Sequence, residues 1–183
     1  MADDKGFTLW FTGLSGAGKT TISRLVAEEL QARGSRLEIL DGDVVRENLS
    51  KGLGFSKKDR DTNIRRISFV ADLLSRNGVP VITAAISPYR EIRAEARELM
   101  GDRFIEVFVK ASVEVCAERD AKGLYEKAFK GEIKEFTGVS DPYEEPLDPE
   151  LVLETENQSP EESAGRVLSL LEERQLIPAA QPA

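Results

Sequence analysis

Hydrophobic residues fall into two alternating patterns along the chain: short apolar runs and longer stretches with helical spacing. The short runs predict strands at residues 7–12, 37–40, 79–86, 104–109 and 151–153. Helical spacing fills the intervals, with starts near residues 19, 44, 57, 88, 113 and 160. Because strand and helix alternate about five times, we expect a five-stranded parallel sheet with helices on both faces, a three-layer α/β fold.

Capping residues support several of these helix starts. Ser56 with Asp59, and the sequence Ser159-Pro160-Glu161-Glu162, match the capping-box pattern. Ser112 is a simple cap, and Ser87 before Pro88 predicts an N-cap followed by proline at the first helical position. On this interpretation the Ser87 hydroxyl is explained by helix capping.

The segment 120–149 matches neither pattern. It has mixed signals, many charges and three prolines, so we expect an irregular, mobile lid inserted into a single domain that spans 1–183. The tail 178–183 is expected to be disordered, and the polar start 1–5 does not resemble a signal peptide.

Composition removes several classes of function. The chain has no histidine and a single cysteine, Cys116, which excludes a Ser-His-Asp triad, a histidine metal site and an internal disulfide. A reducing compartment fits this composition, and we expect a cytoplasmic protein. The longest apolar run is too short to span a membrane.

Charge is unevenly distributed. The net charge is −8, yet residues 132–162 alone hold eleven acids and one base. The rest of the chain is therefore close to neutral and can hold an anionic ligand, whereas nonspecific nucleic-acid binding is not expected.

A phosphate-binding motif follows the first predicted strand. Gly13-Leu14-Ser15-Gly16-Ala17-Gly18-Lys19-Thr20 matches G-x-x-x-x-G-K-[ST], the P-loop. Its glycines let backbone amides point at phosphate oxygens, and the next helix adds the positive end of its dipole. Lys19 is expected to reach the β- and γ-phosphates and the Thr20 hydroxyl to ligate Mg²⁺. The sequence thus predicts a nucleoside triphosphate site.

Two carboxylates favour a small kinase. The third predicted strand contains no acid and the chain has no Asn-Lys-x-Asp motif, which argues against a GTPase. Asp41 and Asp43 instead follow the second strand, with Arg46 close behind. A carboxylate there can face both Mg²⁺ and an attacking hydroxyl. The alternative is that Asp43 only caps the next helix.

A third motif begins at Phe55. Arg60 and Asn63 are three residues apart and share a helical face, which could bind an anionic ligand while Phe55 stacks on a planar ring. The alternative is a solvated, charged helix start.

Together these segments resemble the adenylylsulfate kinases (APS kinases), which phosphorylate the 3′-hydroxyl of adenosine 5′-phosphosulfate (APS). The resemblance covers about residues 7–177, and its ordered series of motifs is specific. The motifs are Phe11-Thr12-Gly13-Leu14-Ser15-Gly16-Ala17-Gly18-Lys19, Leu40-Asp41-Gly42-Asp43, Asp59-Arg60 with Asn63-Ile64-Arg65-Arg66, Ile86-Ser87-Pro88-Tyr89-Arg90, Lys122-Gly123-Leu124-Tyr125, Gly131-Glu132-Ile133-Lys134 with Phe136-Thr137-Gly138, and Pro149-Glu150-Leu151.

The resemblance implies roles for individual residues. Asp43 corresponds to the acidic residue at the acceptor hydroxyl, and Phe55 and Phe136 to two aromatics that sandwich the APS adenine. The other APS contacts it implies are Arg46, Arg60, Asn63, Ile86, Ser87, Lys122 and Leu124. For ATP it implies the P-loop with Thr21, and Arg119 with the 155–158 loop, including Gln158. Mg²⁺ is expected on Thr20 and Asp41, directly or through water, and the family resemblance suggests a homodimer.

Ser87 aligns with a serine that many family members carry as a phosphoserine. Direct in-line transfer from ATP needs no covalent step, so we expect a positioning role instead. Phe136 could alternatively be an ordinary core aromatic.

The chain departs from the family in small ways: Thr20 stands where many relatives have serine, and no sulfurylase domain is attached, which suggests the monofunctional form. Two other readings stay open. One is another small P-loop kinase, acting on a sugar acid, shikimate or a nucleoside monophosphate. The other is a module that binds APS or nucleotide without catalysis.

Overall fold

A parallel sheet of five strands in the order β2-β3-β1-β4-β5 forms the centre of the molecule. The computed structural model describes residues 6–120 and 122–179. The strands are β1 (Thr8–Thr12), β2 (Glu38–Asp41), β3 (Val81–Ala84), β4 (Phe104–Lys110) and β5 (Leu151–Glu154). All four neighbouring pairs are parallel, as predicted. The chain order reverses around β1, so the P-loop leaves the middle of the sheet, where ligands bind in such folds.

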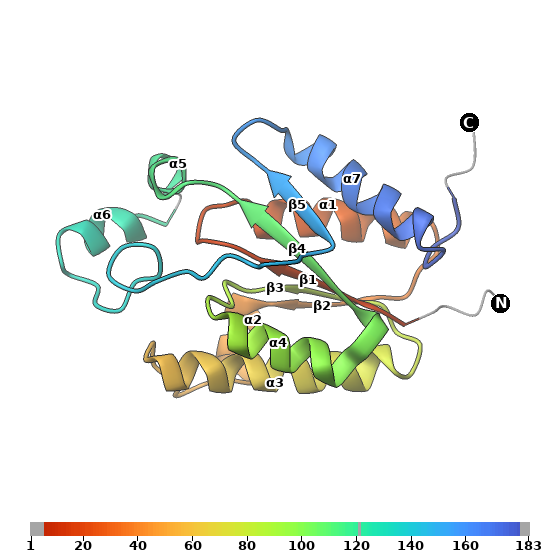
Figure 1. Ribbon diagram of the computed structural model, residues 1–183, viewed down its shortest axis with the longest axis horizontal. Helices are drawn as coiled ribbons and strands as arrows, with labels where there is room; N and C mark the ends of the chain where they lie inside the picture. Colours follow the sequence, from red (N-terminus) through yellow and green to blue (C-terminus); the bar gives the residue numbers. More distant parts are fainter. Residues whose placement is uncertain (1–5, 121, 180–183) are drawn as a thin grey trace.

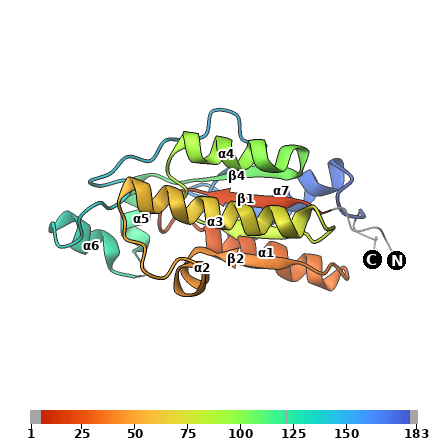
Figure 2. The same ribbon diagram turned by 90° about the horizontal axis from the view of Figure 1, so that it is seen from below.

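Helices cover both faces of this sheet (Figure 1). On one face lie α1 (Lys19–Ala32) and α7 (Pro160–Glu173), and on the other α3 (Lys57–Ser75) and α4 (Arg90–Met100). Figure 2, which views the molecule from below, shows α3 and α4 side by side in front of the strands. The remaining helices are α2 (Gly42–Asn48), the 3₁₀ turn Gly101–Arg103, α5 (Val113–Arg119) and α6 (Leu124–Phe129). The three-layer α/β fold is confirmed.

Strand β1 divides the core into two clusters. Phe7, Leu9 and Phe11 point into the cluster under α1 and α7, whereas Trp10 points into the cluster under α3 and α4. All four side chains are fully buried. Burial on both faces explains why this strand has no exposed polar face and why it holds the P-loop rigidly.

Three of the predicted helix caps are confirmed, and two details of the capping predictions are wrong. The hydroxyls of Ser56 and Ser112 cap α3 and α5, and residues 159–162 form the full capping box of α7. Asp59, however, accepts from the backbone amide of Gly54 and does not complete a capping box. Ser87 is not an N-cap, because α4 begins at Arg90 and Ser87 has a left-handed backbone with φ 42°. The third strand is correspondingly shorter than predicted, ending at Ala84.

The segment 120–149 is more ordered than the sequence suggested. It contains α6 and a bridge between Thr137 and Asp141, and Tyr125 and Ala128 are buried against the first cluster. Outside α6 the described part of the segment is largely irregular, as predicted, whereas α6 and its buried residues were not expected from the sequence. Its mobility stays a prediction. The tail prediction falls mostly on 180–183 and the leader prediction on 1–5, both outside the described residues.

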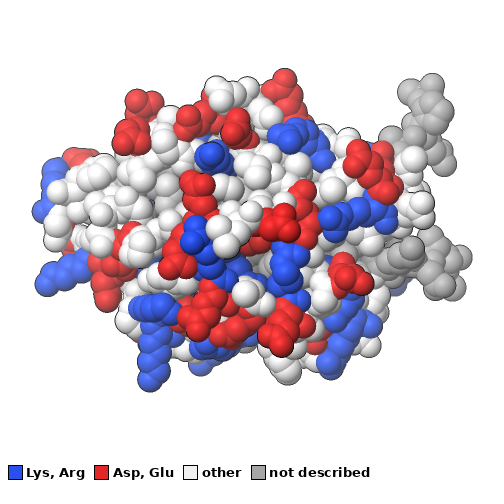
Figure 3. Space-filling view, in the orientation of Figure 1, with Lys and Arg blue, Asp and Glu red and all other residues white. Residues whose placement is uncertain are grey.

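Two of the eleven acidic residues of 132–162 form ion pairs with arginines of α3 and α4. Asp141 lies 3.1 Å from Arg60, and Glu150 lies 2.6 Å from Arg97. Accordingly, acidic and basic side chains alternate on the face drawn in Figure 3 and do not form one acidic patch. Within the described residues, no helix has the length and apolar character of a membrane span.

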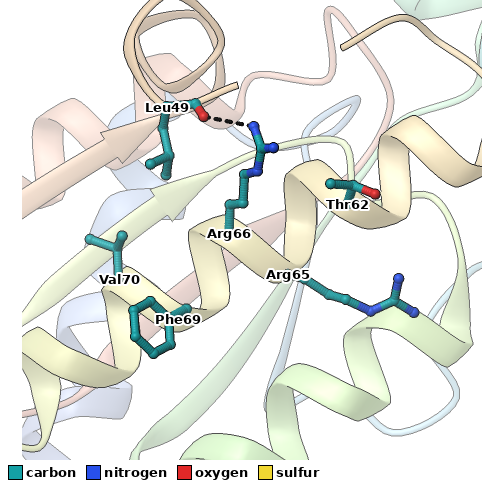
Figure 4. A pocket seen from close by; sticks show the side chains of 6 residues that line it. All are labelled: Leu49, Thr62, Arg65, Arg66, Phe69 and Val70. Atoms are coloured by element: carbon teal, nitrogen blue, oxygen red, sulfur yellow. Dashed lines mark hydrogen bonds between the residues drawn. The ribbon is translucent and has the colours of Figure 1, made fainter. Parts of the chain in front are cut away.

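A shallow pocket of about 290 Å³ lies on the outer side of α3, away from the strand ends. Arg66 closes one side of it by donating to the Leu49 carbonyl, and Phe69 forms part of its apolar wall (Figure 4). It shares no lining residue with the larger cavity at the carboxyl edge of the sheet.

Candidate functional site

A cavity of about 890 Å³ lies at the carboxyl edge of the sheet, between the P-loop, α2, the start of α3 and the 120–149 segment. Every residue predicted for the site lines it except Gly13 and Leu14. Residues more than 140 positions apart therefore meet in one space that can hold two nucleotide-sized ligands.

The P-loop is shaped by glycine. Gly13 has φ 150°, and a Cβ added there would lie 2.3 Å from the Val109 carbonyl oxygen, so a side chain is excluded by the neighbouring strand. The cap residue of α1 is Gly18, which offers no side-chain acceptor, and the first turn of α1 carries no acid. The first amides of α1 are thus left available for an anion, as phosphate binding requires.

Lys19 is folded back onto its own loop. Its Nζ donates to the carbonyls of Gly13 at 2.8 Å and Leu14 at 2.7 Å. Burial lowers the pKa of this amine from 10.5 to about 8. The Lys19 ammonium is therefore poorly solvated, and its two hydrogen-bond acceptors are neutral carbonyls. A bound polyphosphate would supply the negative charge that stabilises it.

Asp41 has two partners at the end of β2. Its Oδ1 accepts from the backbone amide of Asp43 at 3.0 Å, which makes Asp41 the N-cap of α2, and its Oδ2 accepts from the Thr20 hydroxyl at 3.2 Å. The alternative in which Asp43 is the cap is therefore wrong, and the Asp43 carboxylate is left to face the cavity. Thr20 and Asp41 present a pair of hard oxygen donors, which suits Mg²⁺ that keeps most of its ligands as water and phosphate.

A cationic, aromatic wall lies opposite the P-loop. The Arg46 guanidinium packs 4.5 Å from the centre of the Phe55 ring, and that ring is still 55% exposed. Burial and the nearby Arg60 charge lower the pKa of Arg46. Asn63 adds a buried Oδ1 that finds no hydrogen-bond partner among the described residues. Two crowded cations and an unpaired amide oxygen are typical of a site that awaits an anionic, hydrogen-bonding ligand.

Arg60 is nearly fully buried and is occupied by the chain itself. It donates to the Phe55 carbonyl at 2.7 Å, to the Thr137 hydroxyl and to the Glu135 carbonyl, and it pairs with Asp141 at 3.1 Å. In this structure Arg60 therefore fastens residues 135–141 to α3. The solvated-helix alternative is wrong for Arg60 and Asn63, since both side chains are buried.

Phe136 and Tyr125 close the far side of the cavity. Their rings meet edge to face with centroids 4.9 Å apart, and the Tyr125 hydroxyl donates to the Ser15 carbonyl at 2.7 Å. Phe136 lines the cavity and also packs on the core beneath, so it is partly a core aromatic, and its stacking on the APS adenine stays a prediction. Tyr125 links the 120–149 segment directly to the P-loop.

Lys122 reaches across the mouth of the cavity to Asp43, with Nζ 2.5 Å from Oδ2. Both side chains are largely exposed, at 61% and 73%, so this ion pair contributes little to stability. Its position matters more, because it places an exposed cation beside the carboxylate expected at the acceptor hydroxyl. Leu124 lines the same wall.

Ser87 is at the opposite wall and is only 1% exposed. Its Oγ accepts from Trp10 Nε1 at 3.1 Å and donates to the Ala85 carbonyl at 3.3 Å. Ile86 lines the cavity beside it. A hydroxyl committed to two internal hydrogen bonds is poorly placed to attack a phosphate.

Arg119 joins the P-loop to the end of β5. It donates to the Thr155 carbonyl at 2.7 Å and to the Ala17 carbonyl at 3.3 Å. Thr21 and Gln158 line the cavity nearby. These residues make a platform next to the phosphate loop, where the base of a nucleotide would lie.

Sequence reasoning gave no role to several residues that shape the site. Tyr125 appeared only inside a motif, although an aromatic residue in a polar segment was a usable signal. Tyr143 bonds Thr12 through its hydroxyl at 2.8 Å, and Arg93 lies beneath it on α4. Nothing in the local pattern marks these two, because their partners are distant in sequence.

Comparison with known proteins fits this geometry. Residues 5–154 match the family model described as adenylylsulphate kinase. An adenylyl-sulfate kinase of Picosynechococcus sp. (strain PCC 7002) is 61% identical over 93% of this chain and 96% of its own length.

Solved structures agree. An APS kinase of Mycobacterium tuberculosis in complex with AMPPNP and APS superposes with a TM-score of 0.88 at 46% identity, over 92% of this chain and 98% of that one. A hexameric APS kinase from Thiobacillus denitrificans gives a TM-score of 0.74 at 36% identity, and this chain covers 30% of its length. By the family model, and by the Picosynechococcus and Mycobacterium tuberculosis relatives that it covers along nearly their full length, the chain belongs to the adenylylsulfate kinase family.

Proposed function

We propose that this chain transfers the γ-phosphate of ATP to the 3′-hydroxyl of APS, giving 3′-phosphoadenosine 5′-phosphosulfate. One observation carries the proposal: a single cavity joins a complete P-loop to two arginines, an unpaired amide oxygen and the two aromatic rings Phe55 and Phe136. A kinase for a sugar acid or shikimate needs no aromatic pair, whereas an adenine can stack on such rings.

The nucleotide half of the site binds through backbone and charge. The open amides of α1 and the Lys19 ammonium hold the β- and γ-phosphates, and Arg119 with the 155–158 loop supports the adenine. Thr20 and Asp41 would hold Mg²⁺, which neutralises phosphate charge during transfer. Lys19 leaves its two carbonyl partners to do so, and the burial that disfavours its charge then strengthens its attraction to phosphate.

The acceptor half orients APS. Arg46 and Lys122 bind the phosphosulfate group. Asn63 forms a hydrogen bond with the substrate, and the adenine stacks on Phe55 and Phe136. Asp43 accepts the proton of the 3′-hydroxyl. Lys122 has to give up Asp43 when it turns to the substrate anion, so the carboxylate becomes free as APS arrives.

The 120–149 segment serves as the lid of this site. Arg60 and Tyr125 fasten it to α3 and to the P-loop, and Phe136 brings the second ring. Closing it over both substrates excludes water, which would otherwise take the phosphate. Ser87 holds the acceptor wall in shape and is not a phosphate carrier.

Assembly and location follow the family resemblance. We propose a homodimer in the cytoplasm, although the Thiobacillus denitrificans relative is described as hexameric. Sedimentation velocity of the purified chain tests the dimer.

A turnover assay tests the function. The chain, ATP and Mg²⁺ are incubated with APS, shikimate, gluconate or AMP, and ADP release and the phosphorylated product are measured. APS-dependent formation of 3′-phosphoadenosine 5′-phosphosulfate supports the proposal. Transfer to another acceptor, or tight APS binding without transfer, would establish one of the alternatives. Lys19→Ala is the control, since a P-loop enzyme loses most of its turnover without this charge.

A further inference from the structure

Arg93 of α4 is a buried arginine outside the cavity. Its side chain is 3% exposed, yet its guanidinium contacts three other parts of the chain. Nη1 donates to the Ser87 carbonyl at 2.6 Å, Nη2 donates to the Glu144 carbonyl at 2.5 Å, and Nε pairs with Glu106 of β4 at 2.9 Å. A buried guanidinium with such specific partners has to be explained by what it holds together.

The first thing it holds is the acceptor loop after β3. Ser87 is a non-glycine residue with φ 42°, a conformation that persists only where the surroundings impose it. Three hydrogen bonds hold this loop. Arg93 donates to the Ser87 carbonyl, and Trp10 Nε1 donates to the Ser87 hydroxyl at 3.1 Å. The Thr12 hydroxyl donates to the carbonyl of Ile86 at 2.7 Å. All three constraints come from residues that do not line the cavity.

The second thing it holds is the end of the lid segment. The Glu144 amide donates to the Pro88 carbonyl at 2.8 Å, and the Glu144 carboxylate accepts from the Arg90 amide at 2.8 Å. Tyr143 stacks on Phe108 and bonds the Thr12 hydroxyl. The lid segment therefore returns to the body at the same loop that forms the acceptor wall.

We propose that Arg93 is a positioning residue that fixes the acceptor loop and the root of the lid as one unit. It thereby sets affinity for the acceptor and leaves nucleotide affinity unchanged, because none of its contacts reaches the P-loop. The kinetic part of this inference rests on the proposed function. The mechanical part concerns only the coupling of 86–88 to 143–145.

Arg97 provides a matched control. It is the next arginine on the same side of α4 and shares Glu106 with Arg93, at 3.3 Å. Its other partners are Glu150 and the Phe104 ring, and among the described residues it makes no hydrogen bond to Ser87 or Glu144. Arg97→Met therefore disturbs the ion-pair network without releasing the loop or the lid root.

The experiment compares Arg93→Met, Arg93→Lys and Arg97→Met with the unmodified chain. We expect Arg93→Met to raise the KM for APS at least tenfold with the KM for ATP within twofold, and Arg93→Lys to restore part of the loss. Arg97→Met should leave both constants within twofold. Equal increases in the two KM values, or a selective APS effect in Arg97→Met, would overturn the proposal.

Hydrogen exchange of the ligand-free protein gives a readout that does not depend on turnover. Exchange at 86–88 and 141–146 should accelerate together in Arg93→Met and stay unchanged in Arg97→Met. Acceleration at only one of the two segments refutes the coupling. If Arg93→Met does not fold, the milder Arg93→Lys and Tyr143→Phe variants decide the same question. A chain that shows the coupled exchange but no APS turnover would contradict the proposed function and leave the positioning role intact.

Discussion

Nucleotide binding should take up a proton through Lys19. Burial lowers the pKa of its amine to about 8 in the ligand-free protein. Triphosphate oxygens beside it favour the charged form and should return the pKa toward its ordinary value. At pH 8.5 about three quarters of the molecules hold a neutral Lys19 before binding, so each binding event should take up about 0.75 proton. Above pH 8 the affinity should then fall, by about tenfold between pH 7 and pH 9.

Isothermal titration calorimetry measures this uptake. The non-hydrolysable analogue AMPPNP with Mg²⁺ is titrated at pH 8.5 in two buffers with different ionisation enthalpies, and the difference in observed heat gives the number of protons. Lys19→Met should abolish the uptake, and Lys58→Met, at an exposed position on α3, should leave it unchanged. No uptake in the unmodified chain, or the same uptake in Lys19→Met, would refute the reasoning.

The same pKa shift predicts a pH-dependent stability. The folded chain binds fewer protons at Lys19 than the unfolded chain between pH 8 and pH 10.5, so this group should raise the free energy of unfolding with pH in that window, by about 3 kcal/mol in total. The comparison is between denaturant unfolding of the unmodified chain and of Lys19→Met. A difference that stays constant across the window would contradict a lowered pKa.

Three substitutions test the acceptor side. Asp43→Ala should lower kcat at least 30-fold with ATP affinity within threefold, and equal losses would favour a structural role. Phe136→Ala should weaken APS binding by about 10- to 100-fold, since stacking contributes about 1–3 kcal/mol per ring face, whereas AMPPNP affinity, measured by calorimetry, should hardly change. Ser87→Ala should keep substantial activity but lose about 1–3 kcal/mol of stability, because Trp10 Nε1 is left unpaired. A folded but inactive Ser87→Ala protein would restore the phosphoserine hypothesis.

Loops and helix ends could be predicted from the sequence because they depend on residues that are close together along the chain. The P-loop, the capping box at 159–162 and the helix cap at Ser56 each depend on residues within a few positions of one another. The order of strands in the sheet needs contacts between distant segments, and no single pattern fixed it. The same holds for Ser87: a serine before proline is a good cap by pattern, but Trp10 and Arg93 pull it into a left-handed conformation.

The candidate site divides in the same way. Lys19, Thr20 and Asp41 could be placed from their motif and their position at strand ends, and they lie where expected. Arg60 could be assigned only by resemblance, and its contacts to 135–141 involve partners about 75 residues away. The 120–149 segment was judged by its prolines and charges, yet Tyr125 anchors it to the P-loop. The composition of such a segment indicates how polar its surface is, but it does not predict which residues attach the segment to the rest of the chain.

The intrinsic fluorescence of Trp10 can report on the structure of the acceptor wall. It is the single tryptophan of the chain, it is fully buried, and its indole nitrogen is bonded to Ser87. Its emission therefore reports on one hydrogen bond at the edge of the acceptor pocket, with no competing fluorophore of the same kind. Movement of the 86–88 loop on APS binding should change that emission directly, whereas events confined to the adenine platform near Arg119 should leave it nearly constant. Stopped-flow measurements on the unlabelled protein can thus follow acceptor binding separately from nucleotide binding.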